Sequence, residues 1–505
     1  MLALASALTT TAGGYLLVLA IILPVIGILL SLVIGGRHAE RIALALMPVG
    51  FGIALAIAIE IWRTGKPLVY ILGGWTPPLG IALRADGFSA VMLVTAALVV
   101  PAAGYFARAN FQTPQGQFEA RAPLAFWTLL QALWAALNIV FLGGDLFNLY
   151  VALELLTFAA VPLVCLDGRP ETLIAALRYL LFALFGSVFY LLGVALLYGT
   201  YGTLDIVLLS ARVRAEPAVY VAAGLMTAGL LAKTALFPLH LWLPPAHANA
   251  PAPASAVLSA LVVKGSFFLI VRLWFDVLPA LTIEAATSIL ATLGAAAILF
   301  GSILALRQER LKLLIAYSTV AQIGYLFLMF PLATGGHPWS ADAWNGGVLQ
   351  VLSHAFAKAA MFLAAGLVAE SLGHDRISDL RGLGRAMPMT VFAFGLGGLS
   401  LMGLPPSGGF AAKWLLVKAS VESGQWLWAV VMLAGGLLAG GYVYRVLAPA
   451  LANGSTPLET RKSTSRSREA IALALAFVAV LLGLAPAGFF TFLQIGRSAA
   501  MAGLQ

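Results

Sequence analysis

Apolar runs of about 20 residues, each long enough to cross the hydrocarbon core of a bilayer as a helix, recur along this 505-residue chain. Of its residues, 61% are hydrophobic and only 10% are charged, which is too little charge to cover a soluble protein of this size. The runs also lack the alternating pattern of a membrane barrel. The sequence therefore predicts an all-α polytopic membrane protein.

The pattern predicts 14 spans, of which the twelfth is interrupted. They cover residues 14–36, 42–62, 86–106, 123–142, 145–166, 173–199, 217–239, 254–275, 283–305, 313–334, 345–370, 386–421, 425–448 and 470–493. The first charged residue is Arg37, so no basic segment precedes the first run. This favours a membrane span over a cleaved signal peptide at the start of the chain.

Basic residues are distributed unevenly between the two sides of the predicted membrane. With the N-terminus outside, 17 Lys and Arg residues fall on the inner side and 8 on the outer side. The positive-inside rule then predicts that both termini face the periplasm, in an inner membrane of bacterial type. The same distribution accounts for the net charge of +9, so we expect no nucleic-acid partner. The single cysteine, Cys165, excludes an internal disulfide and a thiolate metal site built by this chain alone, and we expect neither metal nor cofactor.

Four lysines, Lys233, Lys264, Lys358 and Lys413, fall inside predicted spans, and Glu154 is the one acidic residue near the middle of a span. A midspan charge costs about 2.5–3.5 kcal/mol on insertion scales. Structural pairing could explain one such pair, but five ionisable residues favour a function. Burial disfavours an ammonium ion and a nearby carboxylate favours it. We therefore expect a proton relay in which Glu154 sets whether Lys233 holds its proton.

Histidines accompany these lysines. His354 lies four residues before Lys358, so the two share one helix face and suit a proton relay. His240 and His247 flank the turn between spans 7 and 8 on the inner side, where we predict proton uptake. The alternative is that these are satisfied core histidines. The polar residues of 316–325 ("AYSTVAQIGY") hold water or pack helices together.

Helix breakers interrupt two spans next to a lysine. Pro238 follows Lys233 by five residues in span 7, and Pro405 and Pro406 precede Lys413 in span 12. Broken helices at membrane depth survive only where they line protein or water, and they are typical of ion transporters. A simple proline kink is the alternative. The likeness of spans 7 and 12 indicates two five-span repeats, which have inverted topology because five is odd.

These patterns divide the chain into four parts. Residues 1–122 hold spans 1–3 and a short outer hairpin within 68–83, and residues 123–275 hold the first repeat, spans 4–8. Residues 283–448 hold the second repeat, spans 9–13, and residues 449–505 hold a polar, basic linker and the last span. We find no segment with the composition of a soluble domain.

Six motifs together resemble the antiporter-like, proton-translocating membrane subunits shared by respiratory complex I, membrane-bound hydrogenases and Mrp-type cation/proton antiporters. They are "DLFNLYVALELLTF", "AKTALFPLHLWLPPAHANAP", "SAVLSALVVKG", "AYSTVAQIGY", "HAFAKAAMFLAAG" and "GLPPSGGFAAKWLL", and the resemblance covers about residues 86 to 450. It implies 14 spans with two inverted repeats, and protons that enter near span 7, cross along a hydrated midplane and leave near span 12. The family's relay positions are matched here by Glu154, Lys233, Lys264, His354, Lys358 and Lys413.

The chain departs from the family pattern at three places. Pro245 stands where the family usually has Asp in "LPDAH", and Gly265 and Ser266 replace Thr-Gly after the central lysine. The segment "FAAVPLV" replaces polar residues after the acid of span 5. The first departure concerns contacts of the inner loop, and the other two concern hydration near Glu154 and Lys264.

Residues 73–94, "GGWTPPLGIALRADGFSAVMLV", are similar to the start of the Mrp D subunit. We interpret the chain as a proton-translocating subunit of a multisubunit monovalent cation/proton antiporter, with other membrane subunits, protons, Na⁺ or K⁺ and the lipid bilayer as partners. The alternative is a proton-pumping subunit of a complex I-like NADH:quinone oxidoreductase or membrane-bound hydrogenase. Because the chain has no flavin, nucleotide or cluster motif, a partner would then hold every redox centre. A purely structural scaffold is the third hypothesis, and it predicts normal transport when Lys233 or Lys264 is neutralised.

Overall fold

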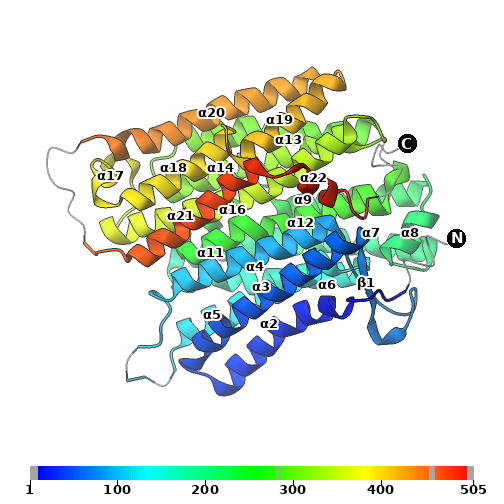
Figure 1. The fold of residues 1–505 in the computed structure, drawn as a ribbon, viewed down its shortest axis with the longest axis horizontal. Helices are drawn as coiled ribbons and strands as arrows, with labels where there is room; N and C mark the ends of the chain where they lie inside the picture. The colour runs from blue at the N-terminus through cyan, green and yellow to red at the C-terminus, as the bar shows by residue number, and fades with distance from the viewer. Residues whose placement is uncertain (1–8, 115, 118, 282–283, 454–460, 498–505) are drawn as a thin grey trace.

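The computed structural model describes residues 9–114, 116–117, 119–281, 284–453 and 461–497. Within these ranges, 13 helices are long and apolar enough to cross a membrane. The long helices lie side by side in one bundle and run roughly along one direction (Figure 1). The predicted all-α polytopic membrane fold is therefore confirmed.

The first three spans are α2 (Tyr15–Ile34), α3 (His38–Thr64) and α4 (Gly87–Ala107). Between α3 and α4 lie strand β1 (Leu68–Ile71), the 3-10 turn η1 (Leu72–Gly74) and strand β2 (Ala82–Ala85). The strands pair antiparallel, with Leu68 opposite Ala85 and Ile71 opposite Ala82. The predicted hairpin is therefore present.

The predicted first repeat holds the elements from α5 to η3: α5 (Arg121–Leu142), α6 (Leu146–Val164), α7 (Pro170–Tyr201), α8 (Ile206–Arg212), α9 (Pro217–Thr234), α10 (Leu243–Asn249), α11 (Ala252–Val257), η2 (Leu258–Val262), α12 (Val263–Val271) and η3 (Arg272–Val277). The short turn η4 (Pro279–Leu281) follows it. The predicted second repeat contains α13 (Glu284–Leu306), α14 (Leu311–Phe327), α15 (Met329–Ala333), α16 (Ser340–Leu372), η5 (Ile377–Asp379), α17 (Leu383–Ala386), α18 (Pro388–Met402), α19 (Gly408–Glu422) and α20 (Trp426–Leu451). The boundaries of the two repeats stay predictions.

The last span is α21 (Arg466–Leu481), which η6 (Leu482–Leu484) extends, and a short helix α22 (Ala487–Leu493) follows. The span ends at Leu484 rather than at the predicted residue 493. The reason is Pro486, because a residue before proline is driven out of the helical conformation. Ala485 accordingly has an extended ψ of 129°.

Span 8 is not the regular helix that its sequence predicts. The path from Ala252 to Val277 contains two π-helical stretches, η2 and η3, which lie before and after Lys264. Single π turns inside α-helices are frequent at functional sites. The Lys264 ammonium donates a hydrogen bond to the backbone carbonyl of Ser259, which belongs to η2.

Span 7 breaks earlier than predicted. Helix α9 ends before Pro238, because Ala235 adopts the left-handed conformation with φ 58° and caps the helix. The Leu236 N–H closes this cap by donating to the Leu231 carbonyl over 3.2 Å. A non-glycine residue in a sparsely populated conformation costs about 1–3 kcal/mol and persists where its surroundings fix it, often at functional sites. Pro238 then lies in the connection to α10.

Span 12 breaks with the same cap, between α18 and α19. Gly403 is left-handed with φ 81°, and the Leu404 N–H donates to the Leu399 carbonyl over 3.2 Å. Pro405 and Pro406 follow in the connection, as predicted. Span 7 and span 12 run in opposite directions through the bundle (Figure 1), which is the arrangement that inverted repeats require.

Two spans form the interior of the bundle. The span from α11 to η3 and helix α16 are buried over nearly their whole length, whereas α2, α3 and α7 expose large apolar side chains. Apolar side chains that face outward on peripheral helices are suited to contact with lipid tails. Lys264 and the pair His354 and Lys358 therefore lie on the two most enclosed spans.

Both described ends of the chain lie at one end of the bundle. The Thr11 N–H donates to the Val69 carbonyl in β1 over 2.9 Å, and the Gly87 N–H at the start of α4 donates to the Ile495 carbonyl over 3.0 Å. The 13 long helices and the interrupted span 12 make 14 crossings of the described part of the chain, and an even number requires this placement. The periplasmic position of this end stays a prediction.

Candidate functional site

An ion pair between α6 and α9 lies beside the break in span 7. Lys233 Nζ lies 3.1 Å from Glu154 Oε1 and 3.1 Å from Thr157 Oγ1. The same carboxylate accepts a hydrogen bond from Ser187 of α7. Only 6% of the Lys233 side chain and 14% of the Glu154 side chain are exposed. The structure therefore brings together the two residues that the sequence predicted as partners.

Two glycines allow α7 and α9 to hold this pair. A Cβ added to Gly186 would lie 2.5 Å from the Gly229 carbonyl oxygen and 3.2 Å from Lys233 Cγ. A Cβ added to Gly229 would lie 2.2 Å from the Gly186 carbonyl oxygen. Small residues let membrane helices approach this closely. The close crossing keeps Ser187 and Lys233 within hydrogen-bond reach of the carboxylate of Glu154.

Gly186→Val is expected to push α7 away from α9 and to lower transport about tenfold or more, because a 1 Å misplacement of reacting groups can cost about 100-fold. The measurement is ion transport by the complete complex in membrane vesicles, normalised to the amount assembled. Gly199→Val is the matched control, because a Cβ at Gly199 of α7 meets nothing within 4 Å. Equal transport by the two assembled variants would contradict the role of the crossing.

A pair of hydroxyls and a small cavity lie between the ion pair and span 8. Thr234 Oγ1 lies 3.0 Å from Ser266 Oγ, and Lys233 and Ser266 both line a cavity of about 10 Å³, which is room for about one water. Lys264, two residues before Ser266, is completely buried. Ser266 is one of the departures from the family pattern, and here its hydroxyl lines the cavity beside Lys233.

A further pair of hydroxyls joins the two halves of the bundle. Ser259 Oγ of η2 lies 3.0 Å from Thr319 Oγ1 of α14. Thr319 donates to the Ile315 carbonyl over 2.9 Å, and Lys358 Nζ of α16 donates to the same carbonyl over 3.0 Å. Since the backbone of Ser259 also accepts from Lys264, a continuous set of polar contacts runs between these two buried lysines.

The contacts continue from Lys358 toward α20. Lys358 Nζ donates to Ser318 Oγ over 2.5 Å. The Tyr442 hydroxyl of α20 interacts with the side chains of Ser318 and Gln322, and it lies 3.4 Å from Gln322 Nε2. The sequence predicted that Ser318 and Gln322 hold water or pack helices. It gave no signal for Tyr442, which lies in an apolar span and reaches α14 only through helix packing.

The set of contacts ends at the break in span 12. Gln322 Nε2 donates to the Leu401 carbonyl of α18 over 3.1 Å, and Lys413 Nζ of α19 donates to the same carbonyl over 2.5 Å. The Lys413 ammonium also lies 4.1 Å from the centre of the Tyr325 ring, an attractive cation–π arrangement. Lys413 is therefore held by a carbonyl and an aromatic face rather than by a carboxylate.

Tyr442→Phe is expected to lower transport about fivefold, because it removes one buried hydroxyl whose hydrogen bonds are worth about 1 kcal/mol. The ring stays in place, so the complex should assemble normally. Tyr444→Phe on the same helix is the control, since Tyr444 is 73% exposed. Transport assays on the two variants, at equal amounts of assembled complex, decide whether the hydroxyl of Tyr442 belongs to the route.

His354 and His247 lie buried near the central lysines. Among the described residues, neither ring nitrogen of either histidine has a hydrogen-bond partner. The charges of Lys264 and Lys358 act on both rings. Buried polar atoms without a protein partner indicate ordered water as the partner. No direct hydrogen bond links His354 to Lys358 in the described ranges, so their connection requires such water.

His240 is also buried, between aromatic rings. Its ring centroid lies 5.6 Å from that of Phe237 and 5.4 Å from that of Phe300. The two histidines predicted to take up protons, His240 and His247, are therefore both enclosed by protein within this chain.

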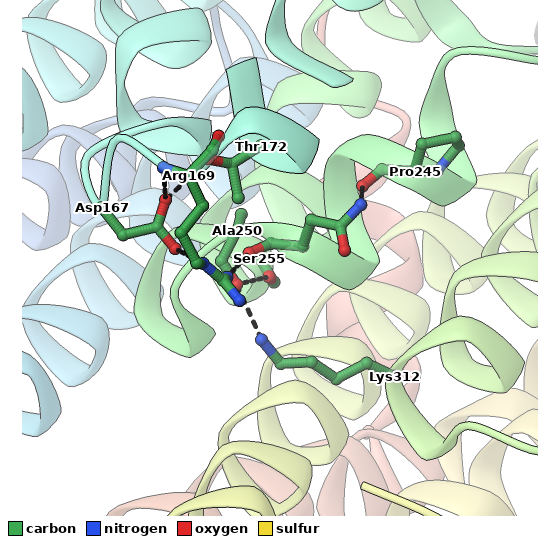
Figure 2. A network of polar contacts seen from close by, with 8 residues as sticks. Asp167, Arg169, Thr172, Pro245, Ala250, Ser255 and Lys312 are labelled. Carbon is green, nitrogen blue, oxygen red and sulfur yellow. Dashed lines mark hydrogen bonds and ion pairs between the residues drawn. The ribbon is translucent and has the colours of Figure 1, made fainter. Parts of the chain in front are cut away.

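The segment that carries His247 is tied to both halves of the bundle (Figure 2). Ser255 Oγ donates to the His247 carbonyl over 2.7 Å. From the other half, Lys312 at the start of α14 donates from Nζ to the Ala250 carbonyl over 2.7 Å. These contacts fix the backbone around His247 between α11 and α14.

The loop after α6 completes this network. Asp167 accepts from Arg169 Nε over 2.5 Å and from Thr172 Oγ1 over 2.6 Å. Burial raises the pKa of the Asp167 carboxyl, but these hydrogen bonds outweigh burial and hold that pKa below its usual value. Arg169 also reaches the Asn249 carbonyl (3.4 Å), and Asn249 Nδ2 donates to the Pro245 carbonyl (3.0 Å). Pro245, where the family usually has Asp, thus contributes a backbone acceptor.

A bundle of membrane spans with buried lysines, a buried carboxylate–lysine pair and two broken helices defines the class of ion-translocating membrane subunits. Residues 143–439 match the family described as "NADH:quinone oxidoreductase/Mrp antiporter, TM". The chain belongs to this family, which confirms the resemblance found in its motifs.

The relatives come from both branches of the family. The chain is 39% identical to the N subunit of the NADH-quinone oxidoreductase of Desulforudis audaxviator, over 82% of this chain and 80% of that protein. It is 30% identical to the D subunit of the Na(+)/H(+) antiporter of Alkalihalophilus pseudofirmus, over 84% of each chain. A chain in the structure of a membrane-bound sulfane sulfur reductase, an archaeal respiratory membrane complex, superposes with a TM-score of 0.85 at 27% identity, covering 97% of both chains. These relatives support a proton-translocating membrane subunit of a multisubunit complex.

Proposed function

We propose that this chain carries protons across the membrane along the buried row that begins at Glu154 and ends at Lys413. The observation that carries the proposal is the buried ion pair of Glu154 and Lys233, at 3.1 Å, beside the break in span 7. Beyond this pair, Ser266 of span 8 lines a small cavity together with Lys233, and hydroxyl and carbonyl groups link Lys264 to Lys358. A buried charge is costly, so a row of them needs a function.

The ion pair of Glu154 and Lys233 can switch between two states, which differ in whether the carboxylate contacts the ammonium. While the carboxylate of Glu154 contacts Lys233, it stabilises the ammonium form. When the carboxylate swings away from Lys233 while it keeps its hydrogen bond from Ser187, the ammonium loses that stabilisation, and its proton passes toward Ser266 and Lys264. Two neighbouring ammonium ions repel each other, so each proton that arrives displaces the next one along the row.

The histidines extend this route at two places. We assign proton uptake to His247 and His240, which lie at the turn between spans 7 and 8 close to the network of Lys312. We assign the link between Lys358 and its neighbours to His354, through water at its unpaired ring nitrogens. In the predicted orientation, uptake is from the inner side of a bacterial membrane, with both termini in the periplasm.

For the driving reaction we propose monovalent cation/proton antiport, with Na⁺ or K⁺, in a complex with other membrane subunits. The identity of 30% with the D subunit of an antiporter supports this. The second candidate is proton pumping driven by a redox partner, and the identity of 39% with the N subunit of an oxidoreductase favours it. The buried row of ionisable residues is compatible with both driving reactions. In either case it moves protons only, and among the described residues it contains no redox group.

The test uses everted vesicles that carry the complete set of neighbouring subunits. Respiration sets up a pH gradient, and Na⁺ or K⁺ is then added. Collapse of the gradient by one cation, lost with Lys233→Ala, supports antiport and identifies the ion. Proton pumping on addition of an electron donor, without a cation response, supports the redox candidate. Transport that survives Lys233→Ala in either assay contradicts the proposed row and supports a structural scaffold.

A further inference from the structure

A groove on the side of the bundle lies outside the proton route. It consists of two cavities, of about 440 Å³ and 380 Å³, which share Leu98 of α4, Phe356 of α16 and Val478 of α21. The shared residues make the cavities one continuous groove. Its walls are α3, α4 and α21, and in Figure 1 these helices lie on the same side of the bundle, toward the viewer.

The floor of the groove belongs to the helix that carries part of the relay. Leu352 and Phe356 of α16 line the groove and are nearly completely buried. They lie two positions before and two positions after His354, and residues two apart on a helix face different sides of it. An occupant of the groove therefore packs directly against the helix that positions His354 and Lys358.

The two ends of the groove differ in chemistry. One end contains Trp62 of α3, and the other contains Tyr105, Arg108 and Ser467. Aromatic residues at both ends match the two interfaces of a membrane. Arg108 pairs through Nε with Glu40 over 2.8 Å, and its side chain is 50% exposed. This end lies on the side with the excess of basic residues.

The narrowness of the groove favours a hydrocarbon chain over a helix as the occupant. From Ser467 to Leu482 the groove follows α21 for about 22 Å at 1.5 Å per residue. A helix of that length with side chains, about 10–12 Å wide, needs roughly 1,700 Å³. The cavities of about 440 and 380 Å³ would enclose only part of such a helix. A flexible hydrocarbon chain, in contrast, fits a narrow apolar groove.

We propose that this groove binds an anionic phospholipid, with an acyl chain along α21 and the phosphate at Arg108 and Ser467. Basic pockets between membrane helices on the cytoplasmic side are suited to anionic head groups. The exposed hydroxyl of Ser467, which lies 2.7 Å from Ser465 Oγ, and the guanidinium of Arg108 supply hydrogen bonds to phosphate oxygens. The lipid fills the space beside Phe356 and thereby holds α16 in place.

The test measures bound lipid rather than transport, so it is independent of the proposed proton route. The complete complex is purified from vesicles of equal parts phosphatidylglycerol and phosphatidylcholine, and retained phospholipids are counted by native mass spectrometry. We expect the wild type to retain phosphatidylglycerol preferentially. Val478→Trp, which fills the junction of the two cavities, should lose one lipid per complex. The matched control is Val430→Trp on α20, at a residue that is 61% exposed, and it should retain that lipid.

A second variant covers the case in which Val478→Trp fails to assemble. Ser467→Asp adds a negative charge at an exposed position, and it should lower the preference for phosphatidylglycerol about fivefold, since one surface charge near anionic lipid is worth about 1 kcal/mol. The proposal is overturned if assembled Val478→Trp retains as many phospholipids as wild type, or if Ser467→Asp keeps the preference. Recovery of an isoprenoid quinone, or a cross-link from Val478 to a partner subunit, also overturns it.

Discussion

Assembled complexes that carry Lys264→Ala are expected to lose about 100-fold or more of their proton transport, the lower range for loss of a positioned proton-transfer group. Lys264 is completely buried on the most enclosed span, and its ammonium donates to the Ser259 carbonyl. On one side the polar contacts lead toward Lys233, and on the other side they lead to Lys358. Its removal therefore interrupts the row at its centre.

Three further variants separate proton transfer from packing and from charge. Lys264→Met keeps most of the side-chain volume and should be as inactive as Lys264→Ala. Lys264→Arg keeps a positive charge but cannot release a proton, so it should also be inactive. Lys66→Ala, at an exposed lysine, is the control and should transport normally. Full transport by assembled Lys264→Arg would show that the site needs only a charge, and the relay would then be refuted.

Glu154→Gln is expected to have an effect of similar size. The amide keeps the shape of the side chain but removes the negative charge that faces Lys233 at 3.1 Å. Removal of one partner from a buried ion pair costs about 3–5 kcal/mol, and every 1.4 kcal/mol is about tenfold in an equilibrium. The occupancy of the charged form of Lys233 should therefore change by more than about 100-fold, and transport should fall accordingly. Initial rates in vesicles, at equal amounts of assembled complex, measure this loss.

The control for this variant is Glu171→Gln, at an exposed acid in the first turn of α7. Glu154→Asp retains the charge at a shorter reach, so we expect it to keep part of the transport. If Glu154→Gln transports as well as Glu171→Gln, the ion pair has no part in proton movement. If Glu154→Asp is as inactive as Glu154→Gln, the position of the carboxylate matters as much as its charge.

Much of the fold could be predicted because the membrane imposes a simple local requirement. A helix that crosses a bilayer needs about 20 apolar residues, and this can be read from a single window of sequence. The all-α fold, the hairpin and the break at Pro405 and Pro406 follow from such local patterns. The early end of α9 could not be predicted, because Ala235 adopts a left-handed conformation that alanine disfavours in isolation.

The ionisable residues of the candidate site were predicted from the free-energy cost of placing them in a membrane span. An ionisable side chain is expensive anywhere in a membrane span, so Glu154, Lys233 and Lys264 are conspicuous in the sequence. Tyr442 and Ser266 are not, because hydroxyl groups are common in membrane helices and serve packing as often as transport. Their place between the lysines depends on contacts such as that between Tyr442 and Gln322, which are 120 residues apart.

The sequence by itself thus determined the number of spans, the buried charges and the family motifs. Each of these depends on residues close together in the chain and on the free-energy cost of placing them in lipid. Only the tertiary structure decided that Glu154 meets Lys233, that hydroxyls and carbonyls link Lys264 to Lys358, and that a groove borders α16. These features depend on side chains from separate spans, and helix packing, unlike hydrophobicity, leaves no periodic signal in the sequence that specifies the partner.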